Sequence, residues 1–326
     1  MAKTHAIRIT EFGGPEKLKW EEVDLPAPGA GELLLRQTAC GLNYVDTYQR
    51  SGLYPLTLPS GLGLEAAAVV EAVGPGVTGF KPGDRVGYNA APAGAYAERR
   101  VYPAAKAVKL PDGIDDKTAA AMLLRGMTVE YLIRRTFPVK KGQTVLFHAA
   151  AGGLGLIAGQ WLSHLGVTVI GTVGSDEKAR IAREHGYHHV INYRTENFVA
   201  RVKEITGGKG VPVVYDGVGK DVFMASLDCL SLRGMMVTFG NASGPVPTIE
   251  PLILSQKGSL FLTRPSLGHY TSTREELLES AQALFDIVLS GAVKVPVNQT
   301  YPLKDTAQAH RDLEARRTTG ATVLLP

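Results

Sequence analysis

The chain has 326 residues, of which 44% are hydrophobic and 20% charged, so it is long enough to bury a sizeable core without disulfide bonds. Its formal net charge of +4 is small for this length and gives no reason to expect nucleic acid as the main partner. It contains no run of about 18 apolar residues that could span a membrane, and the N-terminal sequence MAKTHAIRITEF lacks the apolar segment of a signal peptide. Two cysteines, Cys40 and Cys229, are too few for a disulfide framework. We therefore expect a cytoplasmic protein that does not associate with membranes.

Residues 1–124 predict a mostly-β domain. Short apolar runs, such as HAIRI, ELLLRQTA, AAAVVEAV and RVGY, alternate with glycine- and proline-rich turns, such as PAPGAGE and GPGVTGFKPGDRV. One short helical segment, NYVDTYQRSG, follows the strand that we expect to end near Ala39. Regular helices between these strands are not indicated.

From about residue 119 onward the pattern changes to alternating helices and strands. A helical segment, KTAAAMLLRGMTVEYLIRRT, has apolar residues three and four apart. The strands expected after it are TVLFHA, VTVIGTV, HVINY, PVVYDGVG and MMVTFG, separated by the helices GLGLIAGQWLSHLG, DEKARIAREHG, ENFVARVKEITG and DVFMASLDCLSLRG. Such a βαβ series is typical of a doubly wound parallel sheet, which we assign to residues 125–264. A long helix, REELLESAQALFDIVLSG, and a last strand, ATVLLP, follow in residues 265–326.

The loop between the first strand and helix of this series indicates a dinucleotide site. In the usual pattern one glycine allows the turn, one lets a pyrophosphate approach the backbone, and one lets the helix pack against the strand. Ala150 takes the first position, and the predicted contacts are Gly152, Gly153, Leu154 and Gly155. A plain βα turn is the alternative, but the βαβ series around the loop makes it the weaker interpretation.

The end of the second strand favours NADP over NAD. An NAD site usually has an acidic residue at this point to hold the ribose 2′-hydroxyl. Here the strand ends in Gly174 and Ser175, and Lys178 follows, so we predict that Ser175 and Lys178 hold a 2′-phosphate. Ser175 is also expected to cap the following helix, which is compatible with that role. Tyr193, after the third strand, is a candidate for stacking on the adenine or its phosphate.

The chain resembles the zinc-independent NADPH:quinone oxidoreductases, the zeta-crystallin-like group of the medium-chain dehydrogenase/reductase superfamily. The resemblance rests on five segments in family order: GLNYVDTYQRSGLYP, GLGLEAAAVVEAVGPGVTGFKPGDRV, HAAAGGLG, VVYDGVG and TRPSL. It implies an α/β protein with a Rossmann doubly wound parallel sheet inserted into a GroES-like mostly-β domain. NADPH is expected in the cleft between the two.

The resemblance also implies that no metal is bound. Zinc-dependent relatives have a cysteine where this chain has Asn43, and a histidine where it has Leu64 before Glu65. The four-cysteine loop of those relatives is missing too, so the family's zinc ligands are not present. Cys40 is expected to belong to the core.

The residues near the substrate and the nicotinamide also follow from the resemblance. Asn43 and Tyr48 are the candidates for a catalytic role, and Tyr54 is a further candidate on the substrate side. Packing and helix capping are the alternative roles for this stretch. The remaining cofactor contacts expected are Tyr44, Val45, Asp46, Tyr131, Val218, Phe239, Gly240, Asn241, Ala242, Pro265, Ser266, Leu267 and Arg316.

Reduction of a quinone by NADPH is the predicted reaction, because a quinone is electron-poor and needs little help from an acid. An NADPH-dependent enone or alkenal reductase is the alternative enzyme, in which Tyr48 would have to supply a proton. A cofactor-binding structural or RNA-binding protein is the alternative from another class, and the weak positive charge disfavours it. Residues 257–263, KGSLFLT, are expected to pair with their copy in a homodimer.

Overall fold

The computed structural model describes residues 2–326, which divide into two compact units. Unit 1 comprises the chain up to Arg125 together with Ser272–Phe285 and Val295–Pro326. Unit 2 comprises Gly126–Thr271 and Asp286–Lys294. Within residues 2–326, no helix is both long and apolar enough to cross a lipid bilayer.

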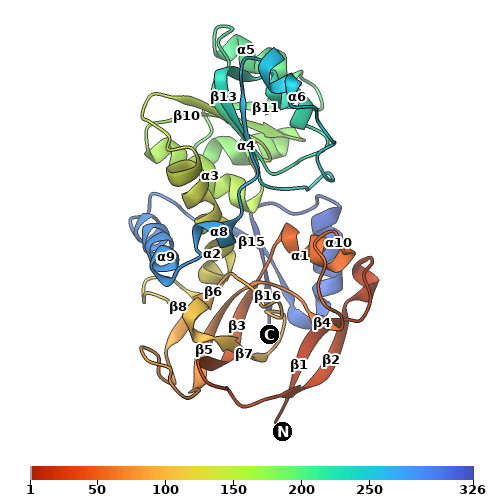
Figure 1. Cartoon of the computed structure of the whole chain (residues 1–326), viewed down its shortest axis with the longest axis vertical. Helices are drawn as coiled ribbons and strands as arrows, with labels where there is room; N and C mark the ends of the chain where they lie inside the picture. Colours follow the sequence, from red (N-terminus) through yellow and green to blue (C-terminus); the bar gives the residue numbers. More distant parts are fainter. Residues whose placement is uncertain (1) are drawn as a thin grey trace. The chain divides into compact units, whose positions relative to one another are not determined.

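Unit 2 is built on a parallel sheet of 6 strands in the order β11-β10-β9-β12-β13-β14 (Figure 1). The strands are β9 (Thr144–Phe147), β10 (Thr168–Val173), β11 (His189–Asn192), β12 (Val211–Asp216), β13 (Leu230–Thr238) and β14 (Phe261–Thr263). The chain runs outward from β9 to one edge and then returns to build the other half. This order confirms the predicted doubly wound sheet and places the strand ends of both halves on either side of β9.

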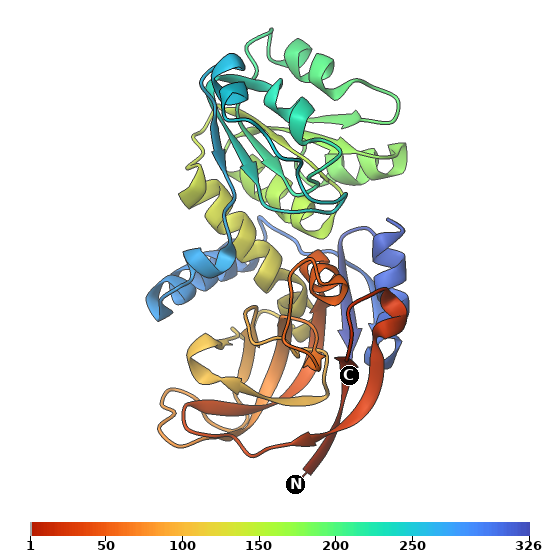
Figure 2. The same cartoon turned by 45° about the vertical axis from the view of Figure 1, so that its right-hand side comes forward.

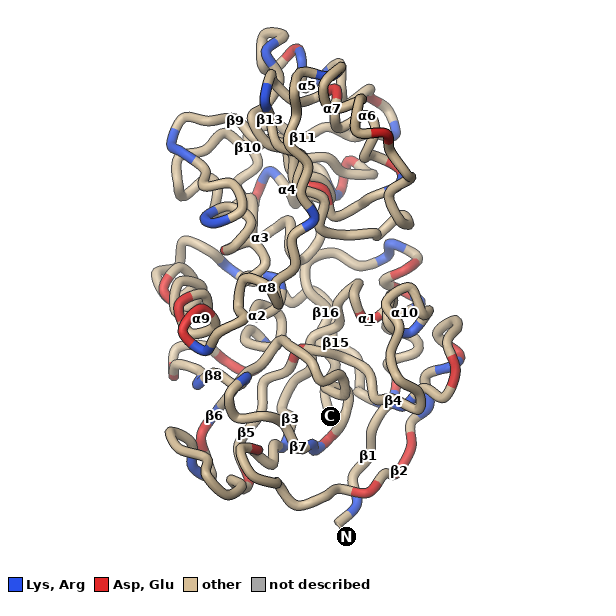
Figure 3. Tube along the Cα trace, viewed as in Figure 1, with Lys and Arg blue, Asp and Glu red and all other residues tan. Residues whose placement is uncertain are grey.

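Helices cover both faces of this sheet (Figure 2). They are α3 (Gly153–His164), α4 (Asp176–Glu184), α5 (Phe198–Ile205), α6 (Phe223–Leu227), α7 (Leu252–Gln256) and α8 (Leu267–Tyr270). Ile170 of β10 packs in a core formed with side chains of α5, α6 and α7. Its neighbour Gly171 faces the opposite way, toward Tyr187 and the side of the sheet that α3 covers. Figure 3 shows β9 and β10 without charged residues, as strands covered on both faces require.

Two boundaries in unit 2 differ from the sequence prediction. The helix expected over DVFMASLDCLSLRG is confined to α6, because the chain enters β13 at Leu230. Leu230 packs into the core of the sheet, whereas Leu232 is 77% exposed, and a positive φ of 59° at Arg233 interrupts the regular alternation at the start of this strand. The strand expected over residues 257–263 is limited to β14, since positive φ angles at Gly258 and Ser259 keep the preceding chain irregular.

Unit 1 contains two sheets. The 7-stranded sheet has the order β15-β16-β3-β5-β6-β8, with β7 paired to β3 off this path, and the 3-stranded sheet has the order β2-β1-β4. Their strands are β1 (Ala2–Ile9), β2 (Lys19–Leu25), β3 (Glu32–Leu42), β4 (Ser60–Gly61), β5 (Glu65–Val73), β6 (Arg85–Tyr88), β7 (Arg99–Pro103), β8 (Val108–Lys109), β15 (Val297–Pro302) and β16 (Ala321–Leu325). Apolar side chains of β1, β3, β5 and β16 form one buried core. The C-terminal strand β16 pairs with β3, so the two ends of the sequence complete one sheet.

The helices of unit 1 lie at the ends of these strands. The α-helices are α1 (Tyr44–Ser51) and α10 (Thr306–Glu314). Two further helices contain boundaries between the units: α2 (Asp116–Tyr131) at Arg125 and α9 (Arg274–Leu289) at Phe285. Short turns are η1 (Pro15–Lys17), η2 (Ala104–Lys106) and η4 (Leu303–Asp305), and a π-helical turn, η3 (Leu132–Thr136), extends α2. Helix α10 was not predicted from the sequence. This helix buries Thr306, Ala309 and His310 on one face, which is too short a pattern to stand out in the sequence.

Candidate active site

The loop between β9 and α3 brings the chain into unusually close contact with the start of the helix. A Cβ atom at Gly155 would lie 2.4 Å from the carbonyl oxygen of Ala149, which leaves room only for glycine. Gly152 precedes α3 in an extended conformation, and within residues 2–326 no side chain caps this helix. The first amide groups of α3 have no acceptor inside the helix. Together with the helix dipole, these amide groups favour an anion such as a pyrophosphate.

Ala150 replaces the first glycine of the usual pattern without disturbing the loop. Its amide donates a hydrogen bond to the carbonyl of Thr172 in β10 at 3.0 Å. A Cβ atom at Gly171 would lie 2.7 Å from the Cβ atom of Ala150. The missing side chain at Gly171 of β10 therefore leaves room for the methyl group of Ala150. Gly171 was not among the residues predicted for this loop.

A buried histidine, His148, connects β9 to the loop before α3. His148, 1% exposed, lies at the end of β9 between the hydroxyl groups of Thr172 and Ser226, each 2.8 Å from a ring nitrogen. The Ser226 hydroxyl donates to the carbonyl of Val222 at 2.7 Å, so it accepts from Nε2–H of His148. Nδ1 then accepts from the Thr172 hydroxyl, which defines a neutral tautomer. Burial lowers the pKa of His148 to about 3.

The end of β10 combines several of the predicted cofactor residues. The Ser175 hydroxyl accepts a hydrogen bond from the Lys178 amide at 3.3 Å, so Ser175 caps α4 as the sequence suggested. A Cβ atom at Gly174 would lie 2.6 Å from the Tyr193 hydroxyl oxygen. The phenol of Tyr193, itself 38% exposed, thus lies directly over Gly174.

The carboxyl ends of β12 and β13 are joined to the segment after β14. Asp216 accepts hydrogen bonds from the amides of Val218 and Gly219 at 2.7 and 3.0 Å, and burial raises its pKa to about 6. The Arg264 guanidinium donates to the Thr238 hydroxyl and the Gly240 carbonyl, both at 3.0 Å. The turn 239–242 and the segment 265–267 are therefore held together. Neither Asp216 nor Arg264 was predicted, although an acidic residue closing a strand before GVG is a recognisable signal.

Tyr131, near the end of α2, takes part in an aromatic stack. Its ring is 4.5 Å from that of Tyr270 at an interplanar angle of 12°, and the Arg135 guanidinium lies 5.2 Å from the Tyr270 ring centre. Tyr131 is 2% exposed, and burial raises its pKa. This tyrosine is therefore a neutral phenol that presents an apolar ring.

In unit 1, Asn43 belongs to a buried network around Glu65. Its side-chain amide donates to the Glu65 carboxylate at 2.7 Å, and the Leu124 amide donates to the same carboxylate at 2.7 Å. Arg125 lies 3.6 Å from Glu65. Because Glu65 is fully buried among donors, it fixes the Asn43 carboxamide with its nitrogen toward the carboxylate.

Asp46 lies next to this network at the start of α1. Its carboxylate accepts from the backbone amide of Asn43 at 2.8 Å and from the Tyr96 hydroxyl at 2.6 Å. Burial raises the pKa of Asp46 to about 7, with the hydrogen bonds acting in the opposite direction. Asp46 therefore organises the start of α1, in agreement with the capping role considered from the sequence.

Three tyrosines follow one another along α1 and the chain after it. The rings of Tyr44 and Tyr48 are 6.3 Å apart, and those of Tyr48 and Tyr54 are 5.3 Å apart. Tyr44 is half-buried, Tyr48 is buried at 8% exposure and Tyr54 is 38% exposed, so Tyr54 is the open member of the three. The exposed ring of Tyr54 offers an apolar aromatic surface next to α1.

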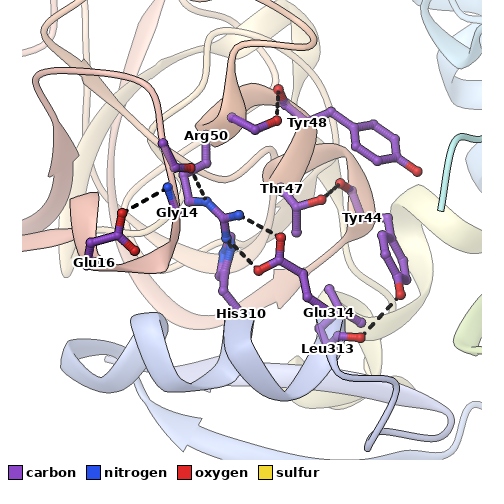
Figure 4. Close-up of polar contacts among 11 residues, drawn as sticks. Gly14, Glu16, Tyr44, Thr47, Tyr48, Arg50, His310, Leu313 and Glu314 are labelled. Carbon is purple, nitrogen blue, oxygen red and sulfur yellow. Dashed lines mark hydrogen bonds and ion pairs between the residues drawn. The ribbon is translucent and has the colours of Figure 1, made fainter. Parts of the chain in front are cut away.

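Helix α1 is fastened to α10 (Figure 4). The Tyr44 hydroxyl donates to the carbonyl of Leu313 at 3.2 Å, and buried Arg50 pairs with Glu314 at 2.6 Å. Arg316, one of the expected cofactor contacts, follows α10 with a φ of 59°, and its side chain is exposed. The position of Arg316 is thus tied to α1 through the end of α10.

Most of the predicted site residues fall into one set in each unit, while Tyr131 lies apart from the strand ends, at the end of α2. In unit 2, residues 152–155, Gly174, Ser175, Lys178, Tyr193, Val218, residues 239–242 and residues 265–267 all lie at the carboxyl ends of the parallel strands or just after them. In unit 1, Asn43, Tyr44, Val45, Asp46 and Tyr48 lie on or beside α1, and Arg316 follows α10. A ligand in an open α/β sheet binds at the edge where the first set lies.

Two family models match successive parts of the chain. Residues 29–112 match the alcohol dehydrogenase GroES-like domain, and residues 153–285 match the zinc-binding dehydrogenase model. A GroES-like unit and a doubly wound sheet with a glycine-rich loop define the medium-chain dehydrogenase/reductase class.

Similar proteins specify the family. The chain is 54% identical over 321 residues to a quinone oxidoreductase of Pseudomonas aeruginosa, with 98% of this chain and 99% of the relative covered. It is 50% identical over 330 residues to a 2-haloacrylate reductase of a Burkholderia species, with 98% of each covered. The crystal structure of Escherichia coli quinone oxidoreductase complexed with NADPH matches with a TM-score of 0.97 and 51% identity, over 100% of both chains. The chain therefore belongs to the quinone oxidoreductase family.

Proposed function

We propose that this protein catalyses the NADPH-dependent reduction of quinones without a metal ion. The observation that carries the proposal is the glycine-only contact of Gly155 with Ala149, which forms a pyrophosphate cradle in a chain 54% identical to a quinone oxidoreductase. NADPH supplies a hydride when bound, and the quinone takes up that hydride and a proton to give a hydroquinone.

The residues of unit 2 bind and orient the cofactor. Amides of residues 153–155 at the start of α3 hold the pyrophosphate, while Ser175, Lys178 and Tyr193 surround the 2′-phosphate and adenine. The turn 239–242 and residues 265–267, joined by Arg264, border the nicotinamide with backbone groups. Because hydride transfer requires close positioning rather than a strong acid, these contacts supply most of what the protein must provide.

The residues of unit 1 bind the acceptor. Asn43, held by Glu65, offers its carboxamide to a quinone carbonyl or to the ribose of the cofactor. The rings of Tyr48 and Tyr54 provide an apolar surface, and Tyr48 can donate a hydrogen bond. Tyr44, Val45, Asp46 and Arg316 complete the cofactor contacts on this side. We infer that residues 1–124 and 265–326 make the substrate domain and residues 125–264 the cofactor domain.

A metal is not needed for this chemistry. The residues at the zinc-ligand positions of related enzymes are an amide and a leucine, Asn43 and Leu64, and the carboxylate of Glu65 is engaged by Asn43 and the Leu124 amide. An amide and an alkyl side chain are poor zinc ligands. A quinone is reduced readily without a Lewis acid, which fits this arrangement.

We propose that the protein is a homodimer in which β14 pairs with its copy. β14 is the edge strand of the 6-stranded sheet, and three apolar side chains near it are exposed: Leu232, Phe261 and Leu262 are 77%, 58% and 37% exposed. An exposed apolar edge invites pairing with another strand. Light scattering should give twice the chain mass for the wild type and a smaller mass for Phe261→Asp, whereas an unchanged dimer in that variant would contradict the role of β14.

We also propose that the protein works in the cytoplasm. Cys40 and Cys229 are both buried and unpaired, as in proteins of reducing compartments. Fractionation of cells that express the protein, with a cytoplasmic marker enzyme, tests this assignment.

The test of function compares two classes of acceptor. Oxidation of NADPH should be fast with 1,4-benzoquinone and slow with an α,β-unsaturated ketone or 2-chloroacrylate, the latter chosen because of the Burkholderia relative. Tyr48→Phe should retain most quinone activity, because no acid is required. Turnover of the alkenes alone, lost in Tyr48→Phe, would replace the proposal by an alkene reductase.

A further inference from the structure

An arginine that the sequence analysis did not consider lies beside the end of β10. A Cβ atom built on Gly174 would be 3.7 Å from Nε of Arg194 and 2.6 Å from the hydroxyl oxygen of Tyr193. Arg194 and Tyr193 follow β11, the strand that pairs with β10. Both side chains therefore reach back to the segment that leads from Gly174 to Ser175, the N-cap of α4.

The charge of Arg194 is not used within the protein. Its side chain is exposed, and none of residues 2–326 forms a hydrogen bond or ion pair with its guanidinium. Arg180 on α4, by contrast, is exposed and pairs with Glu184 at 2.7 Å. The guanidinium of Arg194 is therefore available for an anionic ligand.

Asn192 contacts both Arg194 and Asp176, the acidic residue that follows Ser175. Its side-chain nitrogen donates to the Asp176 carboxylate at 2.9 Å, while its side-chain oxygen accepts from the Arg194 amide at 3.2 Å. Asp176 is therefore engaged with β11, so it is not placed to accept from a ribose 2′-hydroxyl as the acid of an NAD site does.

We propose that Arg194 is a specificity-determining residue that binds the 2′-phosphate of NADPH, beside Gly174 and Ser175. The inference rests on the proposed function, because it assigns the cofactor phosphate to this end of β10. A 2′-phosphate carries nearly two negative charges at neutral pH, and a guanidinium can bind it through two parallel hydrogen bonds. NADH has only a hydroxyl at this position, so Arg194 contributes to the binding of NADPH alone.

Equilibrium binding distinguishes the 2′-phosphate from the rest of the cofactor. Affinities for NADPH, NADH, 2′,5′-ADP and 5′-ADP are measured by calorimetry or by nicotinamide fluorescence, for the wild type and for Arg194→Ala. Arg180→Ala removes the same charge from α4, where Arg180 is paired with Glu184, and serves as the matched control. Arg194→Lys keeps the charge but not the planar group.

Arg194→Ala should lower the affinities for NADPH and 2′,5′-ADP by about tenfold, which is a loss of about 1.4 kcal/mol in binding free energy. The affinities for NADH and 5′-ADP should change by less than about twofold. The effect on the affinity for NADPH should become smaller in high salt, because Arg194 is exposed. Arg180→Ala should bind all four ligands like the wild type, and Arg194→Lys should lose less than Arg194→Ala. Equal weakening of NADPH and NADH, or no weakening of NADPH, would overturn the assignment of Arg194 while leaving the proposed function intact. A wild type that binds neither NADPH nor 2′,5′-ADP would overturn both.

Discussion

Acidification should destabilise unit 2 through His148, the buried imidazole beneath the glycine loop. The ring is neutral, lies between the Thr172 and Ser226 hydroxyls, and has a pKa lowered from 6.5 to about 3 by burial. In the unfolded chain this imidazole takes up a proton below about pH 6.5, whereas in the folded protein it does so only near pH 3. Its contribution to stability is therefore complete above about pH 6.5 and is lost as the pH falls toward 3.

The size of the effect follows from these two pKa values. About pH 5 lies about 1.5 units below the pKa of the unfolded imidazole, whereas at about pH 8 the imidazole is neutral in both states. With about 1.4 kcal/mol per unit, His148 should cost about 2 kcal/mol of unfolding free energy between these pH values. This is a large share of the 5–15 kcal/mol that is typical of a folded domain.

Urea unfolding at both pH values measures this loss, with Trp161 as the reporter of unit 2 in a Trp20→Phe background. In His148→Gln the loss between the two pH values should be about 2 kcal/mol smaller than in the parent. Other titrating groups, including the carboxyl of Asp216, whose raised pKa acts in the opposite direction, are common to both proteins and cancel. His164→Gln, which alters an exposed histidine on α3, should keep the parent's pH dependence. An identical pH dependence in the parent and in His148→Gln would refute the reasoning.

Three further predictions concern the cofactor site and the thiols. Gly155→Ala should lower the unfolding free energy by about 1–3 kcal/mol and weaken the binding of NADPH, because its Cβ atom would lie 2.4 Å from the Ala149 carbonyl oxygen. The Cβ atom of Gly152→Ala would lie 3.3 Å from the same oxygen, so this variant should weaken the binding of NADPH with little effect on urea unfolding. Equal destabilisation of the two variants would contradict this account of the loop. Lys178→Ala should raise the KM for NADPH and leave that for NADH nearly unchanged in steady-state assays, and equal changes would remove its role at the 2′-phosphate. Cys40 and Cys229 should react with a disulfide reagent only on unfolding, since both are buried and burial raises each pKa to about 12, whereas rapid reaction of the native protein would count against these positions.

The parts of the fold that follow from local patterns could be predicted from the sequence. The apolar run before Ala149, the closely spaced glycines and the helix after them predicted the loop between β9 and α3 correctly, because each feature is a short-range property of the chain. The start of β13 was mispredicted because the leucines around Cys229 have helical spacing, and only their packing on the sheet shows that Leu230 already lies in a strand.

Contacts between distant segments account for what the sequence could not show. The alanine at position 150 looked like a weakness of the glycine motif, but Gly171 on the neighbouring strand compensates for it. Arg264, after β14, donates a hydrogen bond to the Gly240 carbonyl after β13, and Asn192 of β11 donates to the Asp176 carboxylate at the start of α4. These pairings depend on the order of strands in the sheet, which single-sequence patterns leave open.

The most direct test of the central claim is the oxidation of NADPH by the protein after exhaustive treatment with EDTA, with 1,4-benzoquinone as acceptor and NADH as the comparison cofactor. Turnover should be unaffected by the chelator, and kcat/KM should be clearly higher with NADPH than with NADH. Loss of activity in EDTA that zinc restores would contradict the metal-free site at Asn43 and Glu65. Binding of NADPH without any reduction of the quinone would contradict the proposed reaction itself.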